Sequence, residues 1–498
     1  MQYPRLREVE RLKGIQGLMD WDEATMMPEG GNKARGLQKA ALAGVVYEKS
    51  VNPELARPLG ELISALEGST GTLTDKQSAV VRDAKRDYEK STRKTKAMAS
   101  REAELATKSY TTWVTARKEK SWSVLAPVLS EVVELKKEIS EATSPSLGAY
   151  DAMLDEYERG MTSERVNEVL SELKEGLIPL IKKISAAVEA DPSLNEVCEP
   201  LQGGDDWDVK KQEELSKLVA ERLGFEMDHG RLDVSVHPFT GGPAPSDVRI
   251  TTRYSTEDWL EGIGATVHEV GHGLCEQGRP AAEFEDLPVS RVLSMGVHES
   301  QSLLWERMVF LNKPFWKFLM PLLHEHFPHT ASCTAEDGYK AANRVTPGLV
   351  RVQADEVTYH LHIILRYEIE SQLMSGDISI ADVPGIWNEK MKSLLGVDVP
   401  SDLEGALQDI HWPLGALGYF PSYSLGAIMA CQIYEKALSD IPGLEDQLAQ
   451  GNFALLREWL RENIHSVGSL YESPDQLLTV VTGEALDPGA LVRHLEKK

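Results

Sequence analysis

The sequence predicts a large, mainly α-helical protein with a small β-sheet beside one helix. Between Gly71 and Gly148 the chain has no other glycine, and its only prolines there are Pro127 and Pro145. Charged and apolar residues alternate along this stretch, which indicates long helices in a hairpin or bundle. The main β signal is confined to residues 231–254.

Length and composition limit the domain organisation and the partners. At 498 residues the chain exceeds the roughly 250–300 that one core usually serves. We therefore expect a mainly helical N-terminal lobe, 1–230, and a second lobe, 231–498, in one inseparable folding unit. Lys and Arg total 53 against 78 Asp and Glu, a net charge of −25, which opposes binding to nucleic acid or to an anionic membrane.

Cysteine usage and hydropathy predict where the protein works. The four cysteines lie far apart in the sequence and form no CxxC motif, which favours reduced thiols over a disulfide framework or a thiolate metal site. The N-terminus lacks the apolar core of a signal peptide, and no run of about 20 apolar residues occurs. We expect a soluble, cytoplasmic protein that contacts no membrane.

Two further helices are predicted in the first lobe. Apolar residues recur at helical spacing from Val166 to Ile181, with Pro179 as a candidate kink. A glycine-rich and acidic segment, 203–206, reads as a loop, after which a helix is expected over 213–223.

Two short strands are predicted at the start of the second lobe. In 231–237 the apolar Leu232, Val234 and Val236 alternate, so they should share one strand face, with His237 on the other. Beyond a predicted turn at Gly241-Gly242-Pro243, the residues Asp247, Arg249 and Thr251 share a face at period two. These strands could form a wall whose polar side faces a functional site; the alternative is an ordinary solvated strand face.

The segment His268-Glu269-Val270-Gly271-His272 is the most informative part of the chain. Ser255 to Asp258 read as a capping box that begins a helix, and Gly278 with Pro280 ends it. Residues i and i+4 of a helix lie on one face, so the two imidazoles can bind one metal ion. Glu269 would then lie beside the open coordination position, as a zinc hydrolase requires. The alternative is a pair of packed core histidines.

A third ligand is expected on the helical pattern between Ser290 and Arg307. Glu299 is the preferred ligand, because two histidines and one glutamate leave one position for water. His298 is the competitor, and adjacent helical residues point about 100° apart, so only one of the two should reach the metal. A solvated surface acid is the alternative for Glu299.

Seven short blocks occur in order along the second lobe, and together they resemble the carboxypeptidase Taq family of zinc metallocarboxypeptidases. The likeness extends upstream through Asp20-Trp21-Asp22 to Pro28 and through Tyr150 to Gly160. One departure is Tyr47-Glu48, where the family would have histidine-glutamate; it concerns N-terminal packing and lies outside the catalytic blocks. The blocks are His237-Pro238-Phe239, Asp247-Val248-Arg249-Ile250-Thr251, His268-Glu269-Val270-Gly271-His272, His298-Glu299-Ser300-Gln301, Arg351-Val352-Gln353-Ala354-Asp355, Gly405-Ala406-Leu407-Gln408-Asp409-Ile410-His411-Trp412 and Gly418-Tyr419-Phe420-Pro421-Ser422-Tyr423.

The resemblance implies a large, elaborated helical metallopeptidase fold with a deep active-site cleft, a small sheet beside the HExxH helix, and a homodimer. It implies a zinc-dependent metallocarboxypeptidase that removes single amino acids from peptides with a free C-terminus. One ion per chain is expected, zinc or alternatively cobalt. By motif, the metal ligands are His268, His272 and Glu299, the general base is Glu269, the carboxylate-binding residue is Arg351, and His237, Arg249, His411 and Tyr423 line the site.

The residues alone leave alternatives open. Arg351 and Asp355 are spaced i,i+4 on a predicted helix that continues past His362, so a surface salt bridge explains them as well as substrate binding does. Only the family motif favours Arg351 as the residue that binds a terminal carboxylate. A zinc endopeptidase or oligopeptidase shares the metal chemistry, and a non-catalytic helical scaffold with a structural metal is the third possibility.

Overall fold

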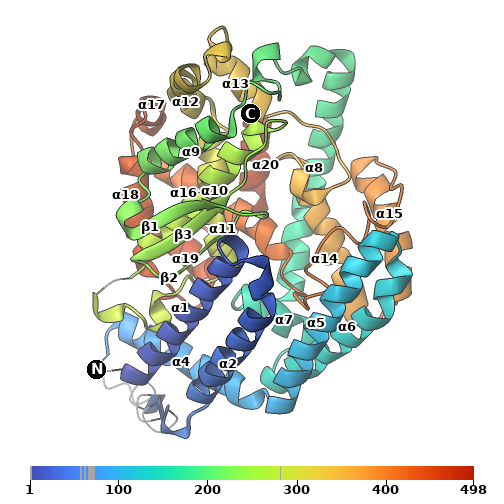
Figure 1. Cartoon of the computed structure of the whole chain (residues 1–498), viewed down its shortest axis with the longest axis vertical. Helices are drawn as coiled ribbons and strands as arrows, with labels where there is room; N and C mark the ends of the chain where they lie inside the picture. Colours follow the sequence, from blue (N-terminus) through green and yellow to red (C-terminus); the bar gives the residue numbers. More distant parts are fainter. Residues whose placement is uncertain (1–2, 56–58, 61–62, 65–72, 281) are drawn as a thin grey trace.

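Helices make up most of the structure, a computed structural model that describes residues 3–55, 59–60, 63–64, 73–280 and 282–498 (Figure 1). The predicted mainly helical class with one small sheet is confirmed. The helices are α1 (Pro4–Thr25), α2 (Asn32–Ser50), α4 (Asp75–Arg93), α5 (Lys96–Glu119), α6 (Trp122–Thr143), α7 (Ala149–Tyr157), α8 (Ser163–Ala190), α9 (Val209–Leu223), α10 (Trp259–Gln277), α11 (Met295–Leu303), α12 (Lys313–His326), α13 (Ala335–Ala342), α14 (Tyr359–Ser375), α15 (Val383–Leu395), α16 (Pro421–Asp440), α17 (Leu444–Ala449), α18 (Ala454–Asn463), α19 (Pro474–Thr482) and α20 (Pro488–Lys497).

The long helices predicted in the first lobe are present as α4, α5 and α6. The Thr74 side chain caps α4 by accepting from the Gln77 amide, and the Gln77 side chain accepts from the Thr74 amide in return. Helices α5 and α6 form an antiparallel pair at one side of the molecule (Figure 1). In α8 the predicted apolar face from Val166 to Ile181 is buried, and Pro179 lies inside the helix. Helix α9 begins at Val209, earlier than expected, because the Asp208 side chain accepts from the Lys211 amide.

One hydrophobic core joins the two predicted lobes. It runs through buried residues from Leu105 in α5 to Leu495 in α20, and it includes α6, α8, α10, α12, α14 and α16. Such a shared core would be expected of one inseparable folding unit, although the boundary at residue 230 stays a prediction. Among the described residues, no helix is both long and apolar enough to cross a membrane.

The sheet has the strand order β1–β3–β2, formed by β1 (Gly230–Val234), β2 (Thr240–Ala244) and β3 (Asp247–Thr252). Strand β1 is parallel to β3, and β2 is antiparallel to β3. The predicted turn at Gly241-Gly242-Pro243 is wrong, because these residues lie inside β2. Helix α1 packs directly on them: a Cβ on Gly14 would lie 2.4 Å from the Pro243 carbonyl oxygen. The glycines here therefore permit a close helix–strand contact.

The predicted apolar face of β1 is also wrong in part. Leu232 is 8% exposed, but Val234 is 54% and Val236 76% exposed. The strand ends at Val234, and β1 lies at the sheet edge, so alternation along it does not produce a buried face. The central strand β3 supplies the buried side chains instead, through Val248 and Ile250.

Helix α10, which carries the His-Glu-Val-Gly-His segment, lies between β3 and α11 near the centre of the molecule (Figure 1). It begins at Trp259, and its N-cap is Asp258, whose side chain accepts from the Glu261 amide. The predicted capping box of Ser255 to Asp258 is therefore wrong: the Ser255 hydroxyl accepts from the Glu257 and Asp258 amides in the turn before the helix and does not cap α10. The helix ends at Gln277, and Gly278 is its C-cap residue, which agrees with the predicted end at this glycine.

Candidate active site

Three predicted metal ligands come together between α10 and α11. One potential ligand atom from each of His268, His272 and Glu299 lies within 4.8 Å of the others. The Glu299 Oε2 atom is 3.4 Å from His272 Nε2 and 3.9 Å from His268 Nε2. Ligand atoms about 2.0–2.2 Å from a tetrahedral zinc ion lie about 3.4 Å apart. The residues present therefore fit one metal ion.

Close helix packing makes this cluster possible. A Cβ on Gly271 would lie 2.6 Å from the Gln301 carbonyl oxygen, so α10 and α11 touch along their backbones. A Cβ on Gly426 of α16 would lie 2.8 Å from the Cβ of Glu299. Two glycines on different helices thus leave room for the α11 backbone and for the Glu299 side chain.

His268 has a second carboxylate partner on its other ring nitrogen. Its Nδ1 lies 2.6 Å from Glu306 Oε2, and Glu306 belongs to a π-helical segment, Leu304–Phe310, that continues α11. A metal-binding histidine usually donates its other N–H to such a carboxylate, which fixes the ring orientation. Short π-helical segments are frequent at functional sites. Sequence reasoning did not identify this contact, because the two residues lie on different helical segments 38 positions apart.

His298, the competing ligand, is directed elsewhere. Its ring stacks on His272 with centroids 4.1 Å apart, and its Nε2 lies 3.2 Å from Glu276 Oε1. The structure therefore brings Glu299 to the two histidines and places His298 behind one of them.

Burial and neighbouring charges together shift the pKa values of the cluster. Burial lowers the pKa of His268, but the hydrogen bond with Glu306 and the charges of Glu299 and Glu306 outweigh burial and raise it to about 10. Burial and the nearby His298 lower the pKa of His272 to about 3. Burial opposes ionisation of Glu299, but the hydrogen bond with His272 and the charge of His268 lower its pKa to about 2. The surroundings are thus rich in carboxylates and suit a cation.

Glu269 is held beside the cluster by the sheet. It is 5% exposed, and its Oε2 accepts a 2.6 Å hydrogen bond from the hydroxyl of Thr240, the first residue of β2. Burial raises the pKa of Glu269. Thr240 follows the predicted His237-Pro238-Phe239 block directly, but sequence reasoning did not identify it as a site residue.

A second group of predicted residues gathers around Arg351. Arg351 is 7% exposed; its Nε and Nη2 donate to Asp409 Oδ1 at 3.0 and 2.8 Å, and its Nη1 donates to the Tyr359 hydroxyl at 3.0 Å. Burial lowers the pKa of Arg351, but Tyr359, Asp409 and Tyr423 outweigh burial and raise the pKa above its usual value. The His411 Nε2 lies 3.1 Å from the Tyr423 hydroxyl, and the Arg351 guanidinium lies 5.1 Å from the Tyr423 ring. Three residues from separate sequence blocks thus share one region.

The predicted helical pair of Arg351 and Asp355 is wrong. Arg351 lies in a single 3-10 turn, Arg351–Gln353, and α14 begins only at Tyr359. Asp355 instead accepts from the amides of Val357 and Thr358 at 3.0 and 2.9 Å. Arg351 pairs with Asp409, which is 58 residues away in sequence and could not be found from helical spacing.

The remaining predicted residues lie on the sheet side. Arg249 makes two 2.9 Å hydrogen bonds to Asp247 and lies 4.2 Å over the ring of Trp21 in α1. His237 is exposed and follows the end of β1. Within the described part of the chain, no hydrogen bond or ion pair joins either side chain to the cluster of His268, His272 and Glu299. Their place as wall residues stays a prediction.

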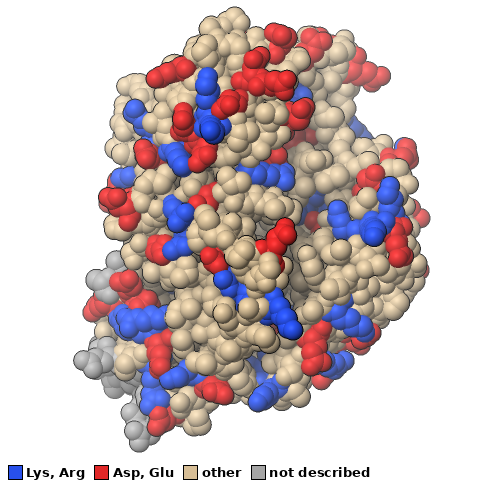
Figure 2. Space-filling view, in the orientation of Figure 1, with Lys and Arg blue, Asp and Glu red and all other residues tan. Residues whose placement is uncertain are grey.

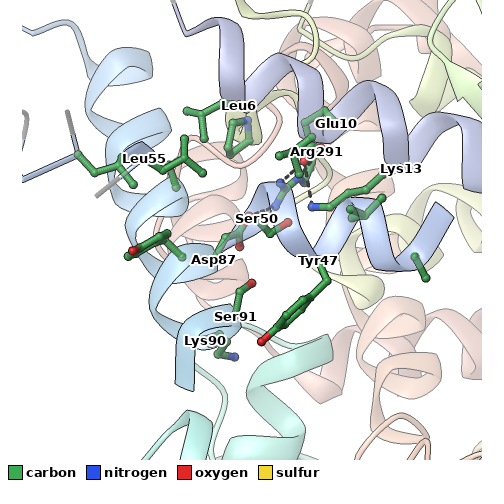
Figure 3. A pocket seen from close by; sticks show the side chains of 17 residues that line it. Leu6, Glu10, Lys13, Tyr47, Ser50, Leu55, Asp87, Lys90, Ser91 and Arg291 are labelled. Carbon is green, nitrogen blue, oxygen red and sulfur yellow. Dashed lines mark hydrogen bonds and ion pairs between the residues drawn. The ribbon is translucent and has the colours of Figure 1, made fainter. Parts of the chain in front are cut away.

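The face seen in Figure 2 is hollowed near its centre. Two cavities of the molecule are lined in part by helix α4. One cavity, of about 670 Å³, reaches His298 and Glu276 and is lined by charged side chains of α4 and α7. The other, of about 390 Å³, lies among α1, α2 and α4 (Figure 3). Tyr47, the departure from the family pattern, lines this second cavity and donates to the Lys94 carbonyl oxygen at 3.3 Å.

Comparisons with known proteins agree over the whole chain. Residues 3–498 match the family described as carboxypeptidase Taq (M32) metallopeptidase. Thermostable carboxypeptidase 1 of Thermus thermophilus is 36% identical, with 99% of this chain and 96% of that protein covered. Carboxypeptidase 1 of Bacillus subtilis is 34% identical with the same coverage.

Solved structures give the same result. Trypanosoma cruzi metallocarboxypeptidase 1 superposes with a TM-score of 0.93 at 36% identity, covering 99% of this chain and 97% of that one. The M32 carboxypeptidase from Deinococcus radiodurans R1 gives a TM-score of 0.92 at 32% identity over the same shares. The chain therefore belongs to the carboxypeptidase Taq (M32) family, and its reaction is that of a metallocarboxypeptidase.

Proposed function

We propose that the chain removes single residues from peptide C-termini with one zinc ion held by His268, His272 and Glu299. The observation that carries this proposal is the cluster of three ligand atoms within 4.8 Å, with a buried glutamate beside it. When bound, such an ion lowers the pKa of its water to about 7 and polarises the scissile carbonyl. Two nitrogens and one oxygen suit zinc, and cobalt is the alternative.

Glu269 acts as the general base and acid in this proposal. Its carboxylate accepts the proton of the attacking water, and the same group then delivers that proton to the departing amine. Burial raises its pKa, which makes it a stronger base than an exposed glutamate. The Thr240 hydroxyl fixes one carboxylate oxygen, which leaves the other for the water.

Arg351 binds the terminal carboxylate of the substrate. Its hydrogen bonds to Asp409 and Tyr359 use Nε–H, one Nη2–H and one Nη1–H. Within the described residues, one further N–H remains on each Nη atom, and two such groups match the two oxygens of a carboxylate. Recognition of this free carboxylate separates a carboxypeptidase from an endopeptidase.

His411 and Tyr423 stabilise the developing oxyanion. Burial raises the pKa of Tyr423, so its hydroxyl stays protonated and can donate a hydrogen bond. Burial lowers the pKa of His411 to about 4, so the imidazole is neutral near pH 7 and orients that hydroxyl through its 3.1 Å contact. His237 and Arg249 are proposed to line the outer wall toward the rest of the peptide.

The first test replaces Glu269 by Gln. The expected result is a fall in kcat of about 10²–10⁴-fold with one metal ion still bound, because the amide cannot accept the proton. Glu261→Gln, on the same helix but in an ion pair with Arg253, is the matched control and should keep its activity. Unchanged turnover in Glu269→Gln, measured at full metal occupancy, contradicts the proposal.

The second test compares one peptide in its free and C-terminally amidated forms. Wild type should release the last residue of the free form only, and a chelator should stop the release. Arg351→Ala should lower kcat/KM on the free form by about 10²–10³-fold, because two charge-assisted hydrogen bonds are lost. Arg344→Ala, an exposed arginine of the same segment, is the control. Internal cuts at equal rate in both forms would favour the endopeptidase, and no hydrolysis would favour the scaffold.

A homodimer in the cytoplasm completes the proposal. The four cysteines are free thiols, which supports a reducing compartment. Light scattering during size-exclusion chromatography measures the molar mass in solution. A mass equal to that of one chain would contradict the dimer.

A further inference from the structure

The segment between His411 and Tyr423 is compact but belongs to no helix or strand until α16 begins at Pro421. We call residues 411–420 the site loop. Its turn is closed by backbone bonds from Gly415 to Trp412 and from Ala416 to His411, each 2.9 Å. Near its end, Gly418 has a positive φ of 84°, and a Cβ there would lie 3.0 Å from the Leu154 amide nitrogen of α7. The loop can therefore adopt this conformation only where it packs closely against α7.

A buried glutamate outside every predicted motif holds both ends of the site loop. Glu370 of α14 is fully buried. Its Oε1 accepts from Trp412 Nε1 at 2.6 Å, and its Oε2 accepts from the Gly418 amide at 2.9 Å. Trp412 follows His411 directly, and Gly418 precedes Tyr419. Oε2 also accepts from the Tyr150 hydroxyl of α7 at 2.9 Å.

The donor pattern around Glu370 requires a carboxylate. The Trp412 and Gly418 groups can only donate, so a protonated Glu370 would find an acceptor only in the Tyr150 hydroxyl. Burial is the largest influence and raises the pKa of Glu370 to about 7, although the three donors and Arg366 oppose it. The other titratable groups that face it are Tyr157 of α7 and Tyr367 of α14. The charge on Glu370 therefore changes within the ordinary working range of pH.

We infer that Glu370 is a positioning residue of this enzyme: its ionised carboxylate fixes the site loop and so places His411 and Tyr423 against the substrate. The inference rests on the proposed roles of those two residues. Loss of the charge releases the Trp412 and Gly418 contacts and lets the loop move. Small misplacements of catalytic groups cost up to about 10²-fold in rate. The fall in kcat on the acid side of the pH profile then follows the protonation of Glu370.

The experiment measures kcat, KM and metal content against pH for Glu370→Gln in the full-length, metal-loaded protein. Gln has the same shape as Glu, but its NH₂ group replaces one carboxylate oxygen. That group would then face a donor, either Trp412 Nε1–H or the Gly418 amide. The expected result is a kcat lowered about 10–100-fold at pH 8, a KM within about twofold, one metal ion per chain, and no fall in kcat near pH 7. Glu368→Gln on the same helix weakens two ion pairs of a half-buried carboxylate, with Lys174 and Lys390, that do not involve the site loop, and it should keep the wild-type profile.

A second variant keeps the test decisive if Glu370→Gln does not fold. Tyr150→Phe removes one donor from the α7 side and leaves both contacts to the site loop. Because a hydrogen bond to the charged form is stronger than one to the neutral form, its loss should move the acid limb up by about one pH unit, while the plateau of kcat above about pH 9 stays the same. A wild-type profile in Tyr150→Phe, or full kcat in folded Glu370→Gln, overturns the inference. Failure of wild type to release C-terminal residues would instead overturn the proposed function.

Discussion

The contact between His268 and Glu306 gives a quantitative prediction about metal affinity. Glu306→Ala removes the acceptor that lies 2.6 Å from His268 Nδ1. The imidazole would lose both its fixed orientation and the negative charge that strengthens it as a ligand. Glu306 does not reach the three-ligand cluster itself, so the variant should retain the same ligands.

The magnitude follows from the type and exposure of this bond. A hydrogen bond to a charged group contributes about 1.5–3 kcal/mol, and water can replace part of it here because the Glu306 side chain is 27% exposed. We therefore take the lower half of that range, which corresponds to a metal Kd raised about 10–50-fold. Glu306→Gln keeps an acceptor oxygen and loses only the charge, so its Kd should rise by less than about tenfold.

A competition titration with a chelator of known affinity measures this Kd directly. Glu261→Gln on α10 is the control, because its exposed ion pair with Arg253 is remote from both histidine nitrogens. At saturating metal, kcat of Glu306→Ala should recover to within a few-fold of wild type. An unchanged Kd in Glu306→Ala, or a lost kcat that no amount of metal restores, would refute the reasoning.

Two further predictions concern a close glycine contact and a pair of neighbouring thiols. Gly426→Ala should weaken metal binding at least tenfold, because its Cβ would lie 2.8 Å from that of Glu299, whereas Gly385→Ala in α15 meets nothing within 4 Å and should be tolerated in the same titration. The thiols of Cys198 and Cys333 lie 3.5 Å apart, so diamide, which accepts the two electrons and two protons, should join them. Closing this 135-residue separation should raise Tm by up to about 5 °C, and Cys198→Ser should abolish the shift; no cross-link in peptide mapping would contradict it.

The parts of the fold and site that the sequence predicted are those fixed by neighbouring residues. The apolar face from Val166 to Ile181 appears as the buried side of α8, because a helical period is a local property. His268 and His272 share a face of α10 for the same reason, with ring centroids 5.0 Å apart. The choice of Glu299 over His298 used only the 100° turn between adjacent residues and the ligand set of zinc peptidases.

The parts that could not be predicted depend on contacts between distant segments. Apolar and polar residues do alternate in 231–237, but Val234 is exposed because β1 is an edge strand. The sequence of one strand does not reveal its position in the sheet. Spacing paired Arg351 with Asp355, whereas packing pairs it with Asp409. The 3.5 Å contact of Cys198 with Cys333 joins residues that looked isolated in the sequence.

Substitutions in these two parts of the site should change different properties of the enzyme. The proposed metal ligands lie on α10 and α11, whose geometry is set by helical period and by glycine contacts, so changes there should act on metal affinity. His411 lies in a loop without regular structure, and Tyr423 lies in the first turn of α16, which follows that loop. In the loop, the buried acid Glu370 provides hydrogen bonds of the kind that a helix or strand makes along its backbone. Changes to that acid should leave metal affinity intact and act on kcat and its pH dependence. A Glu370 variant that lowered both metal affinity and kcat would show that the site loop moves together with α10 and α11.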